Sequence, residues 1–312
     1  MLKRLPALKR HAVFPLLLAL LLLQACGGSD SGVSSAGPVD EQTPGNNDNG
    51  NDSSNNDNGQ QGNGDTTPDA EKATVLVCNN PVGNIEQSQL NNAARADLLC
   101  LHNQTRSQTA LGNFAGLYGN FSIATDMKRL RWDDKLEQVA QAWANQCQWM
   151  HNANRTTEYN ALSPTDINGN AINGTVSVGE NLAYKGSSNQ TSANYQYAID
   201  GYVAWEDEGQ DWGWGNFMVN DFCDTTACGH FTQLIWGDTY KVGCAVNYCP
   251  SGTLSNVPTT YLVCNYASAG NYINNTPYQT TDTLDEVCSQ ADSGQTVCKN
   301  GLTESTTYTT GL

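Results

Sequence analysis

The cysteines constrain the fold of this chain more than any other feature of its sequence. The chain has 11 of them. One, Cys26, ends an N-terminal apolar stretch and is considered with it below, and the remaining cysteines are even in number. None of them forms the C-x-x-C pair that is typical of zinc ligands, so disulfide bonds are the expected state in an exported chain. We therefore expect a domain that is held together by disulfides.

The first 25 residues have the pattern of a secretory signal peptide. A basic start is followed by an apolar core at residues 12–23, and this start contains Lys3, Arg4, Lys9 and Arg10. The core is too short to span a bilayer, which needs about 20 residues. The small Ala25 stands directly before Cys26, as in the lipobox of bacterial lipoproteins, which this segment resembles. That resemblance implies diacylation of the Cys26 thiol, and Gly27 in place of an aspartate implies retention at the outer membrane.

We therefore predict a signal peptide at residues 1–25 and a lipid anchor on Cys26. The expected location is the cell envelope, as an outer-membrane lipoprotein facing the periplasm or the surface, or otherwise the extracellular space. The alternative is an ordinary cleaved signal peptide that is followed by cysteine by coincidence.

Composition divides the rest of the chain. Residues 26–73 are nearly all Gly, Asn, Asp, Ser, Gln and Pro, and such a segment cannot bury enough apolar surface to fold, so it is predicted to be a flexible tether. One domain is expected at residues 74–280, followed by a C-terminal tail at 281–312 with a small disulfide loop. The net charge of -16 and the absence of a basic patch argue against binding to nucleic acid.

Three segments of the domain have helical periodicity. Apolar residues recur at helical spacing over residues 89–106, with Ser88 as a plausible N-cap. Residues 133–149 follow the same pattern, and Asp134 followed by Glu137 resembles a capping box. The third helix is predicted over residues 192–212.

The periodicity changes to that of strands late in the domain. Residues 240–246 and 259–266 are rich in β-branched and aromatic side chains and flank a loop of Pro, Ser and Gly. This pattern predicts an antiparallel hairpin. Helices followed by antiparallel strands indicate an α+β domain with layers.

Five polar side chains are candidates for chemistry. His102 lies within the first predicted helix, His151 follows the second, and His230 precedes the hairpin. Glu180 and Glu208 stand in otherwise apolar surroundings, where a carboxylate needs a partner or a solvated cavity. His102 is expected to be structural, because it lies inside a helix.

Several ordered segments together resemble the CAP superfamily, which comprises cysteine-rich secretory proteins, antigen five proteins and plant pathogenesis-related class one proteins. The resemblance covers about residues 97–278 and fits both signatures of the family, except at Ser268. The matching segments are His102-Asn103 with Arg106, 130–134, 179–182, Trp205 with Glu208 and Trp212, 229–239, 261–272 and 277–278.

The resemblance implies a three-layer α-β-α sandwich with an antiparallel sheet and a cleft lined by His151, Glu180, Glu208 and His230. Two neutral imidazoles suit one divalent ion, with Zn²⁺ as the expected metal, and carboxylates can ligate it or orient its ligands. The alternative is that the four side chains form a hydrogen-bonded cluster with a purely structural role. The other tryptophans, Trp214 and Trp236 among them, are expected in the core and the cleft wall.

The resemblance also implies disulfide pairs, and they follow the plant subgroup of the family. The expected pairs are Cys147–Cys249, Cys223–Cys228 and Cys244–Cys264. The remaining cysteines lie at or beyond the usual set, and their pairing stays open. Proximity suggests Cys288–Cys298, which leaves Cys78–Cys100.

Three functions remain possible from the sequence. The first is a non-catalytic module that binds a lipid, a sterol or another small amphiphile in the cleft, which is what the resemblance implies. The second is a metal-dependent hydrolase that resembles a peptidase, with Glu180 or Glu208 as general base. The third is a surface interaction protein with a vestigial cleft. No nucleophile motif such as G-x-S-x-G or H-E-x-x-H is present, so the binding module is the leading hypothesis.

Overall fold

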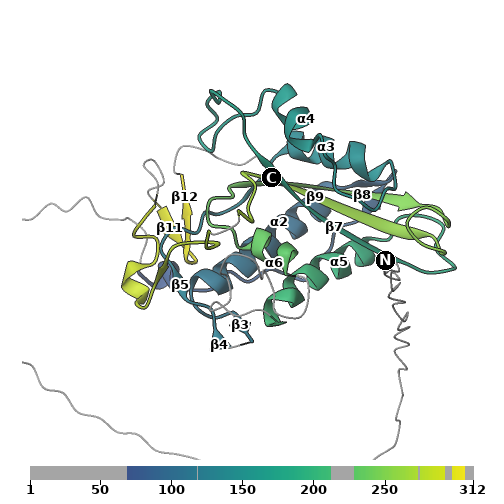
Figure 1. Cartoon of the computed structure of the whole chain (residues 1–312). Coiled ribbons are helices and arrows are strands. Elements are labelled where there is room, and N and C mark those ends of the chain that lie inside the picture. Colours follow the sequence, from purple (N-terminus) through teal and green to yellow (C-terminus); the bar gives the residue numbers. More distant parts are fainter. Residues whose placement is uncertain (1–68, 118, 212–227, 273–274, 292–296, 306–312) are drawn as a thin grey trace, which may run out of the picture. The chain divides into compact units, whose positions relative to one another are not determined.

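The computed structural model describes residues 69–117, 119–211, 228–272, 275–291 and 297–305. Its central sheet has four strands in the order β6-β8-β9-β7 (Figure 1). The strands are β6 (Arg131–Trp132), β7 (Val178–Gly186), β8 (Lys241–Cys249) and β9 (Thr259–Ala267). β9 pairs antiparallel with both β7 and β8, whereas β6 runs parallel to β8. The predicted hairpin is confirmed as β8 and β9.

Helices cover both faces of this sheet (Figure 1). One face carries α3 (Asp134–Ala144) and α4 (Arg155–Ala161). The other carries α2 (Asn92–Ala110), α5 (Tyr195–Asp207) and α6 (Gly229–Leu234). The strand residues divide between two apolar cores, since Cys244 and Val246 pack toward α2 and α5 whereas Ala245 packs toward α3. The expected α-β-α sandwich is therefore confirmed.

The helix starts differ by a few residues from the prediction. α2 is capped by Asn91, whose side-chain oxygen accepts from the Ala94 N–H at 2.9 Å. Ser88 lies instead in the turn between β1 (Ile85–Glu86) and β2 (Gln89–Leu90), at a φ of 64°.

α3 is capped one residue earlier than predicted. The side chain of Asp133 accepts from the N–H groups of Lys135 and Leu136, both at 3.0 Å. Glu137 completes no capping box, because its carboxylate binds Trp132 and an arginine of α2. Gly243 of β8 allows α3 to lie close to the sheet, since a Cβ there would overlap the backbone nitrogen of Glu137.

Two of the predicted helices end early. α3 stops at Ala144 rather than near residue 149, and Cys147 then adopts a φ of 51°, which turns the chain away from the helix axis. α5 stops at Asp207 and is followed by a 3₁₀ turn, η1 (Glu208–Asp211). Trp212, the last residue of the third predicted helix, lies outside the described residues, as does Trp214.

The C-terminal segment belongs to the folded domain, in contrast to the expected tail. β10 (Thr280–Thr281) pairs with β5 (Ile123–Ala124), and β11 (Val297–Lys299) pairs with β12 (Leu302–Glu304). The β11–β12 hairpin packs on α2, where Leu302 is fully buried. Backbone hydrogen bonds between Thr303 and residues 127–129 hold the hairpin in place. The remaining short elements are α1 (Asp69–Lys72), β3 (Ala115–Gly116), β4 (Gly119–Asn120) and η3 (Leu284–Glu286).

The N-terminal boundary of the domain also differs. α1 falls within the last residues of the predicted tether, and the backbone N–H groups of Asn300 and Gly301 donate to the carbonyls of Glu71 and Lys72 at 2.9 and 2.8 Å. The remainder of the tether and the signal peptide, including Cys26, lies outside the described residues.

Four disulfides are present among the described residues. They join Cys78 to Cys100, Cys147 to Cys249, Cys244 to Cys264, and Cys288 to Cys298, which are pairs expected from the sequence. Cys228 is also disulfide-bonded. Its expected partner, Cys223, lies outside the described residues.

One buried cation organises the α2 side of the sandwich. The side chain of Arg106, on α2, is fully buried and donates six hydrogen bonds to backbone carbonyls. Burial lowers the pKa of Arg106 to about 9, so the guanidinium is still charged at neutral pH. The acceptors are Lys128, Leu234, Trp236, Gly237 and Thr239. This one side chain therefore fixes the chain after β5 and the loop after α6.

Candidate functional site

The first element of the site is a pair between His151 and Glu180. Glu180 lies on β7 with a fully buried side chain, and its Oε1 accepts from His151 Nδ1 and from the Asn152 N–H, both at 2.9 Å. With its amide nitrogen turned toward β7, Asn265 donates to the other oxygen, Oε2, at 3.3 Å. The imidazole itself is 58% exposed. A buried, fully engaged carboxylate thus holds an accessible histidine.

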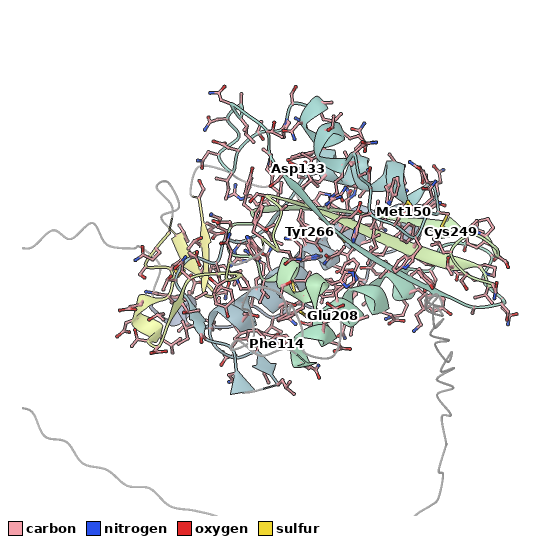
Figure 2. All side chains as sticks on the ribbon, viewed as in Figure 1. Phe114, Asp133, Met150, Glu208, Cys249 and Tyr266 are labelled. Atoms are coloured by element: carbon pink, nitrogen blue, oxygen red, sulfur yellow. A yellow bond between two sulfur atoms is a disulfide. The ribbon has the colours of Figure 1, made fainter. Side chains whose placement is uncertain are left out.

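The second element is a pair between His230 and Glu208, which is labelled in Figure 2. Glu208 Oε1 accepts from His230 Nδ1 at 2.6 Å. Its Oε2 accepts from the backbone N–H groups of His230 and Phe231 at 3.0 and 3.2 Å. The indole of Trp205 stacks on the imidazole, with the ring centroids 5.8 Å apart. The position and the orientation of this histidine are therefore both fixed.

Adjacent residues of β7 contact both pairs. Glu180 binds His151, and the next residue, Asn181, donates from its amide to the backbone carbonyl of His230 at 3.1 Å. The same amide donates to the Tyr266 hydroxyl at 3.3 Å. β7 therefore carries one partner for each histidine segment.

The two pairs share a chemistry that suits metal binding. In each pair a carboxylate accepts from Nδ1, and within the described part of the chain neither Nε2 has a hydrogen-bond partner. This is the arrangement in which a carboxylate fixes the tautomer of a histidine ligand and leaves Nε2 for the metal. The carboxylate oxygens already accept hydrogen bonds from neighbouring N–H groups. The atoms that fit a divalent ion as ligands are therefore the Nε2 atoms of His151 and His230.

The four side chains do not converge as a preformed cage. Among the described residues, no three of them place a ligand atom each within 4.8 Å of one another. The residues that satisfy that criterion are His102, Cys244 and Cys264. Their sulfur atoms form a disulfide, which leaves no thiolate to bind a metal.

His102 has a structural role, as expected. Its Nδ1 lies 2.7 Å from the Leu98 carbonyl and its Nε2 lies 3.0 Å from the Tyr266 hydroxyl. Burial lowers the pKa of His102 to about 4, so the ring is neutral at physiological pH. Nδ1 therefore pairs within α2, and Nε2 joins α2 to β9.

An exposed apolar surface adjoins His151. Trp149 and Met150, the latter labelled in Figure 2, are 53% and 59% exposed. The Trp149 ring meets the edge of Tyr184 with the centroids 4.8 Å apart, and Tyr184 is itself 41% exposed. We call Trp149, Met150 and Tyr184 the aromatic rim. This surface was not predicted from the sequence, although two apolar residues at the end of a predicted helix and directly before a histidine were a usable signal.

Two of the tryptophans that were expected in the core and the cleft wall lie in the core. Trp205 and Trp236 are 2% and 4% exposed and belong to the main apolar core.

None of the described helices is long and apolar enough to cross a membrane.

Comparison with known proteins gives consistent matches. The model of a family described as "CAP: Cysteine-rich secretory protein family" matches residues 99–266. Venom allergen 5 of Microctonus hyperodae is 33% identical over 193 residues, which cover 62% of this chain and 74% of the relative. GLIPR1-like protein 1 of Bos taurus is 33% identical over 204 residues, covering 65% and 70% of the two chains.

A solved structure agrees with the observed fold. The crystal structure of NaASP2 with Zn²⁺ superposes with a TM-score of 0.52 at 25% identity, covering 69% of this chain and 100% of that one.

Proposed function

Because this chain belongs to the cysteine-rich secretory protein (CAP) family, we propose that it is an exported binding module that holds a divalent ion and a small amphiphilic ligand at its histidine pairs. The observation that carries the proposal is the arrangement of His151 and His230. In each ring Nδ1 is hydrogen-bonded to a carboxylate, and Nε2 is left available to bind an ion. The Zn²⁺ in the crystal structure of NaASP2 supports zinc as the first metal to test.

The aromatic rim supports an amphiphile as the ligand. A ligand with a polar head and an apolar body can place the head at His151 and the body against Trp149 and Tyr184. A bound ion would supply positive charge to attract and orient an anionic or carbonyl head group. The protein residues bind and position the ligand.

Binding without turnover is the expected activity. All nine cysteines among the described residues form disulfides, so this part of the chain offers no thiol nucleophile. A hydrolase that uses the same residues remains the rival function, and the surface interaction protein with a vestigial cleft is the other.

Metal binding is the first prediction. Titration of Zn²⁺ into metal-free protein at pH 7.5 should show one site, and replacing both histidines (His151→Ala with His230→Ala) should remove it. Glu180→Gln and Glu208→Gln should weaken binding less, by about 10- to 100-fold, because these residues orient the ligands. Protons compete with metal for the imidazole nitrogens, so occupancy should fall as the pH is lowered. His102→Gln is the matched control, since both ring nitrogens of that histidine are already engaged, by the Leu98 carbonyl and the Tyr266 hydroxyl.

The result also separates the three functions. Binding of fatty acids or sterols that is lost in the double histidine variant, without hydrolysis of peptide or ester substrates, supports the binding module. Turnover that disappears in the same variant supports the hydrolase. If Zn²⁺ does not bind at pH 7.5, or binds equally well to the double variant, the metal site does not exist.

Membrane attachment through Cys26 is the second prediction. The lipobox-like sequence before Cys26 supports acylation of this thiol, which would join the domain to the membrane by its tether. Cys26→Ser should move the protein from the membrane fraction to the soluble fraction and abolish palmitate labelling. Ser29→Ala, three residues away, should change neither property. Labelling that persists in Cys26→Ser would rule out this anchor.

A further inference from the structure

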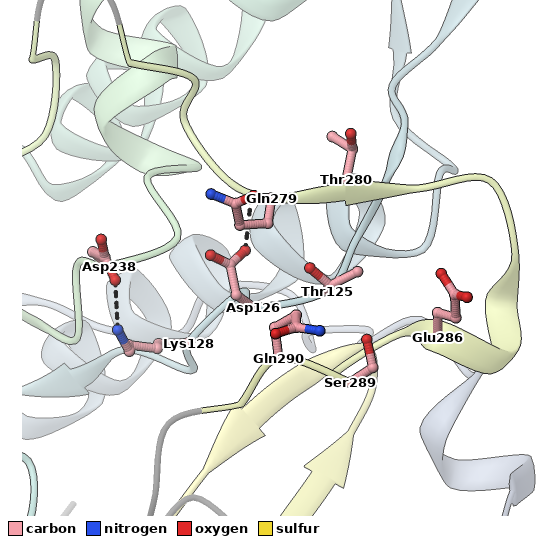
Figure 3. A pocket seen from close by; sticks show the side chains of 9 residues that line it. All are labelled: Thr125, Asp126, Lys128, Asp238, Gln279, Thr280, Glu286, Ser289 and Gln290. Atoms are coloured by element: carbon pink, nitrogen blue, oxygen red, sulfur yellow. Dashed lines mark hydrogen bonds and ion pairs between the residues drawn. The ribbon is translucent and has the colours of Figure 1, made fainter.

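One pocket of the domain lies outside the histidine pairs. It has a volume of about 640 Å³ and contains none of the four predicted metal-site residues (Figure 3). Cavities of this size hold small organic molecules. Its wall combines the chain after β5 with residues of the C-terminal segment, most of which lie beyond the residues matched by the family model. The lining residues are Thr125, Asp126, Lys128, Asp238, Gln279, Thr280, Glu286, Ser289 and Gln290.

Thr125 gives the pocket an unpaired polar group. Its N–H donates to the Gln279 carbonyl and its own carbonyl accepts from the Gln290 N–H, both at 3.0 Å. The residue is only 5% exposed, yet its hydroxyl has no hydrogen-bond partner among the described residues. Buried hydroxyl groups are nearly always paired in folded proteins. In Figure 3 the hydroxyl points to the side of Asp126.

The other lining groups suit a ligand with several hydroxyls. Asp126 Oδ1 accepts from the Gln279 N–H at 2.9 Å. The amides of Gln279 and Gln290 and the hydroxyl of Ser289 offer both donors and acceptors. A sugar hydroxyl needs both, because it donates one hydrogen bond and accepts others.

The charges and their spacing exclude other classes of ligand. Of the lining residues, Asp126, Asp238 and Glu286 are acidic and Lys128 alone is basic, with its ammonium 2.6 Å from Asp238. A negatively charged ligand would therefore be repelled. The three acids do not place carboxylate oxygens within 4.8 Å of one another, so they do not form a compact cation site. A larger, uncharged or cationic ligand fits better.

An adjoining pocket extends the surface. It has a volume of about 520 Å³, shares Asp126, Asp238 and Gln279 with the first, and is lined by Tyr272. The Tyr272 ring is 47% exposed and could stack against the apolar face of a sugar ring. We propose that the Thr125–Asp126 pocket binds a neutral or amino sugar unit of a glycan.

Binding of oligosaccharides tests this proposal. The intact protein should bind neutral or amino oligosaccharides, such as those of mannose, N-acetylglucosamine or glucosamine, on an array that also carries heparin fragments. The strongest binder is then titrated calorimetrically. Thr125→Val removes the buried hydroxyl and Asp126→Asn replaces a charged acceptor with a neutral amide, so each should reduce affinity by about tenfold or more.

Thr259→Val is the matched control. Thr259 also has a buried hydroxyl without a hydrogen-bond partner among the described residues, but it lies on β9 outside this pocket, so the variant should keep its affinity within about twofold. The proposal is overturned by binding confined to heparin or by the absence of any binder. It is equally overturned if affinity survives Thr125→Val and Asp126→Asn, or falls as much in Thr259→Val. The double histidine variant should bind the glycan normally, which separates this proposal from the proposed function.

Discussion

Arg106→Met should destabilise the domain strongly. The variant loses six hydrogen bonds to five carbonyl groups, two of which, those of Trp236 and Gly237, still accept from the N–H groups of Thr239 and Lys128 at 3.1 and 3.2 Å. Each unsatisfied buried group costs about 1–3 kcal/mol, so a loss of roughly 5 kcal/mol or more is expected. Domains of this size are stabilised by only about 5–15 kcal/mol in total. Chemical denaturation followed by circular dichroism measures the change.

Two further variants give this prediction its controls. Arg106→Lys keeps the charge but has fewer donors in a different geometry, so its stability should lie between those of the native protein and Arg106→Met. Arg95→Met removes an arginine from the same helix that is partly exposed and pairs with Glu137 at 2.7 Å. That change should cost about 1 kcal/mol or less. If Arg106→Met is no more harmful than Arg95→Met, the carbonyl network does not stabilise the fold.

Removal of the Cys147–Cys249 disulfide should also destabilise the domain strongly. The bond closes a sequence separation of 102 residues, and the chain-entropy model assigns a loop of that length about 4.7 kcal/mol. The paired change Cys147→Ala with Cys249→Ala should therefore lower the free energy of unfolding by about 4–5 kcal/mol. It should also loosen the segment that carries Trp149 and His151, because Cys147 fixes the start of that segment.

The Cys288–Cys298 disulfide provides the comparison, because its sequence separation is only 10 residues. The same model gives it slightly less than about 3 kcal/mol, so the double alanine variant there should retain more stability. Parallel urea titrations of both variants measure the difference. An equal loss in the two, or a larger loss at Cys288–Cys298, would show that loop length does not determine the contribution of these bonds.

Local pattern was sufficient to predict the elements with strong periodicity. The β8–β9 hairpin was predictable because its β-branched residues flank a turn-rich loop, and α3 because its apolar stripe is regular. The end of α3 was not predictable, because the apolar spacing continues to Cys147. There the backbone leaves the helix and brings His151 to β7. β7 was also missed. Its first five residues are buried, so it lacks the alternation of a half-exposed strand.

The site itself depends on contacts that no periodicity encodes. His151 and Glu180 are 29 positions apart, and Glu208 and His230 are 22 apart. Family resemblance identified these four residues, whereas their separate pairing and the role of Asn181 emerge only in the structure. The pocket at Thr125 was not predictable at all, because Thr125 and Gln290 come from segments that composition assigned to different parts of the chain.

The contact between α1 and the β11–β12 hairpin has a consequence for how this domain can be combined with others. The Glu71 carbonyl and the Asn300 N–H are 2.9 Å apart, so the first and last elements of the fold touch. A domain whose chain enters and leaves at one point can be spliced into a surface loop of a host protein without spreading the two junctions. The same closeness makes circular permutation feasible, with new termini placed in an exposed loop. The described part of the chain is therefore a unit that can be moved within a longer polypeptide without separating its two ends.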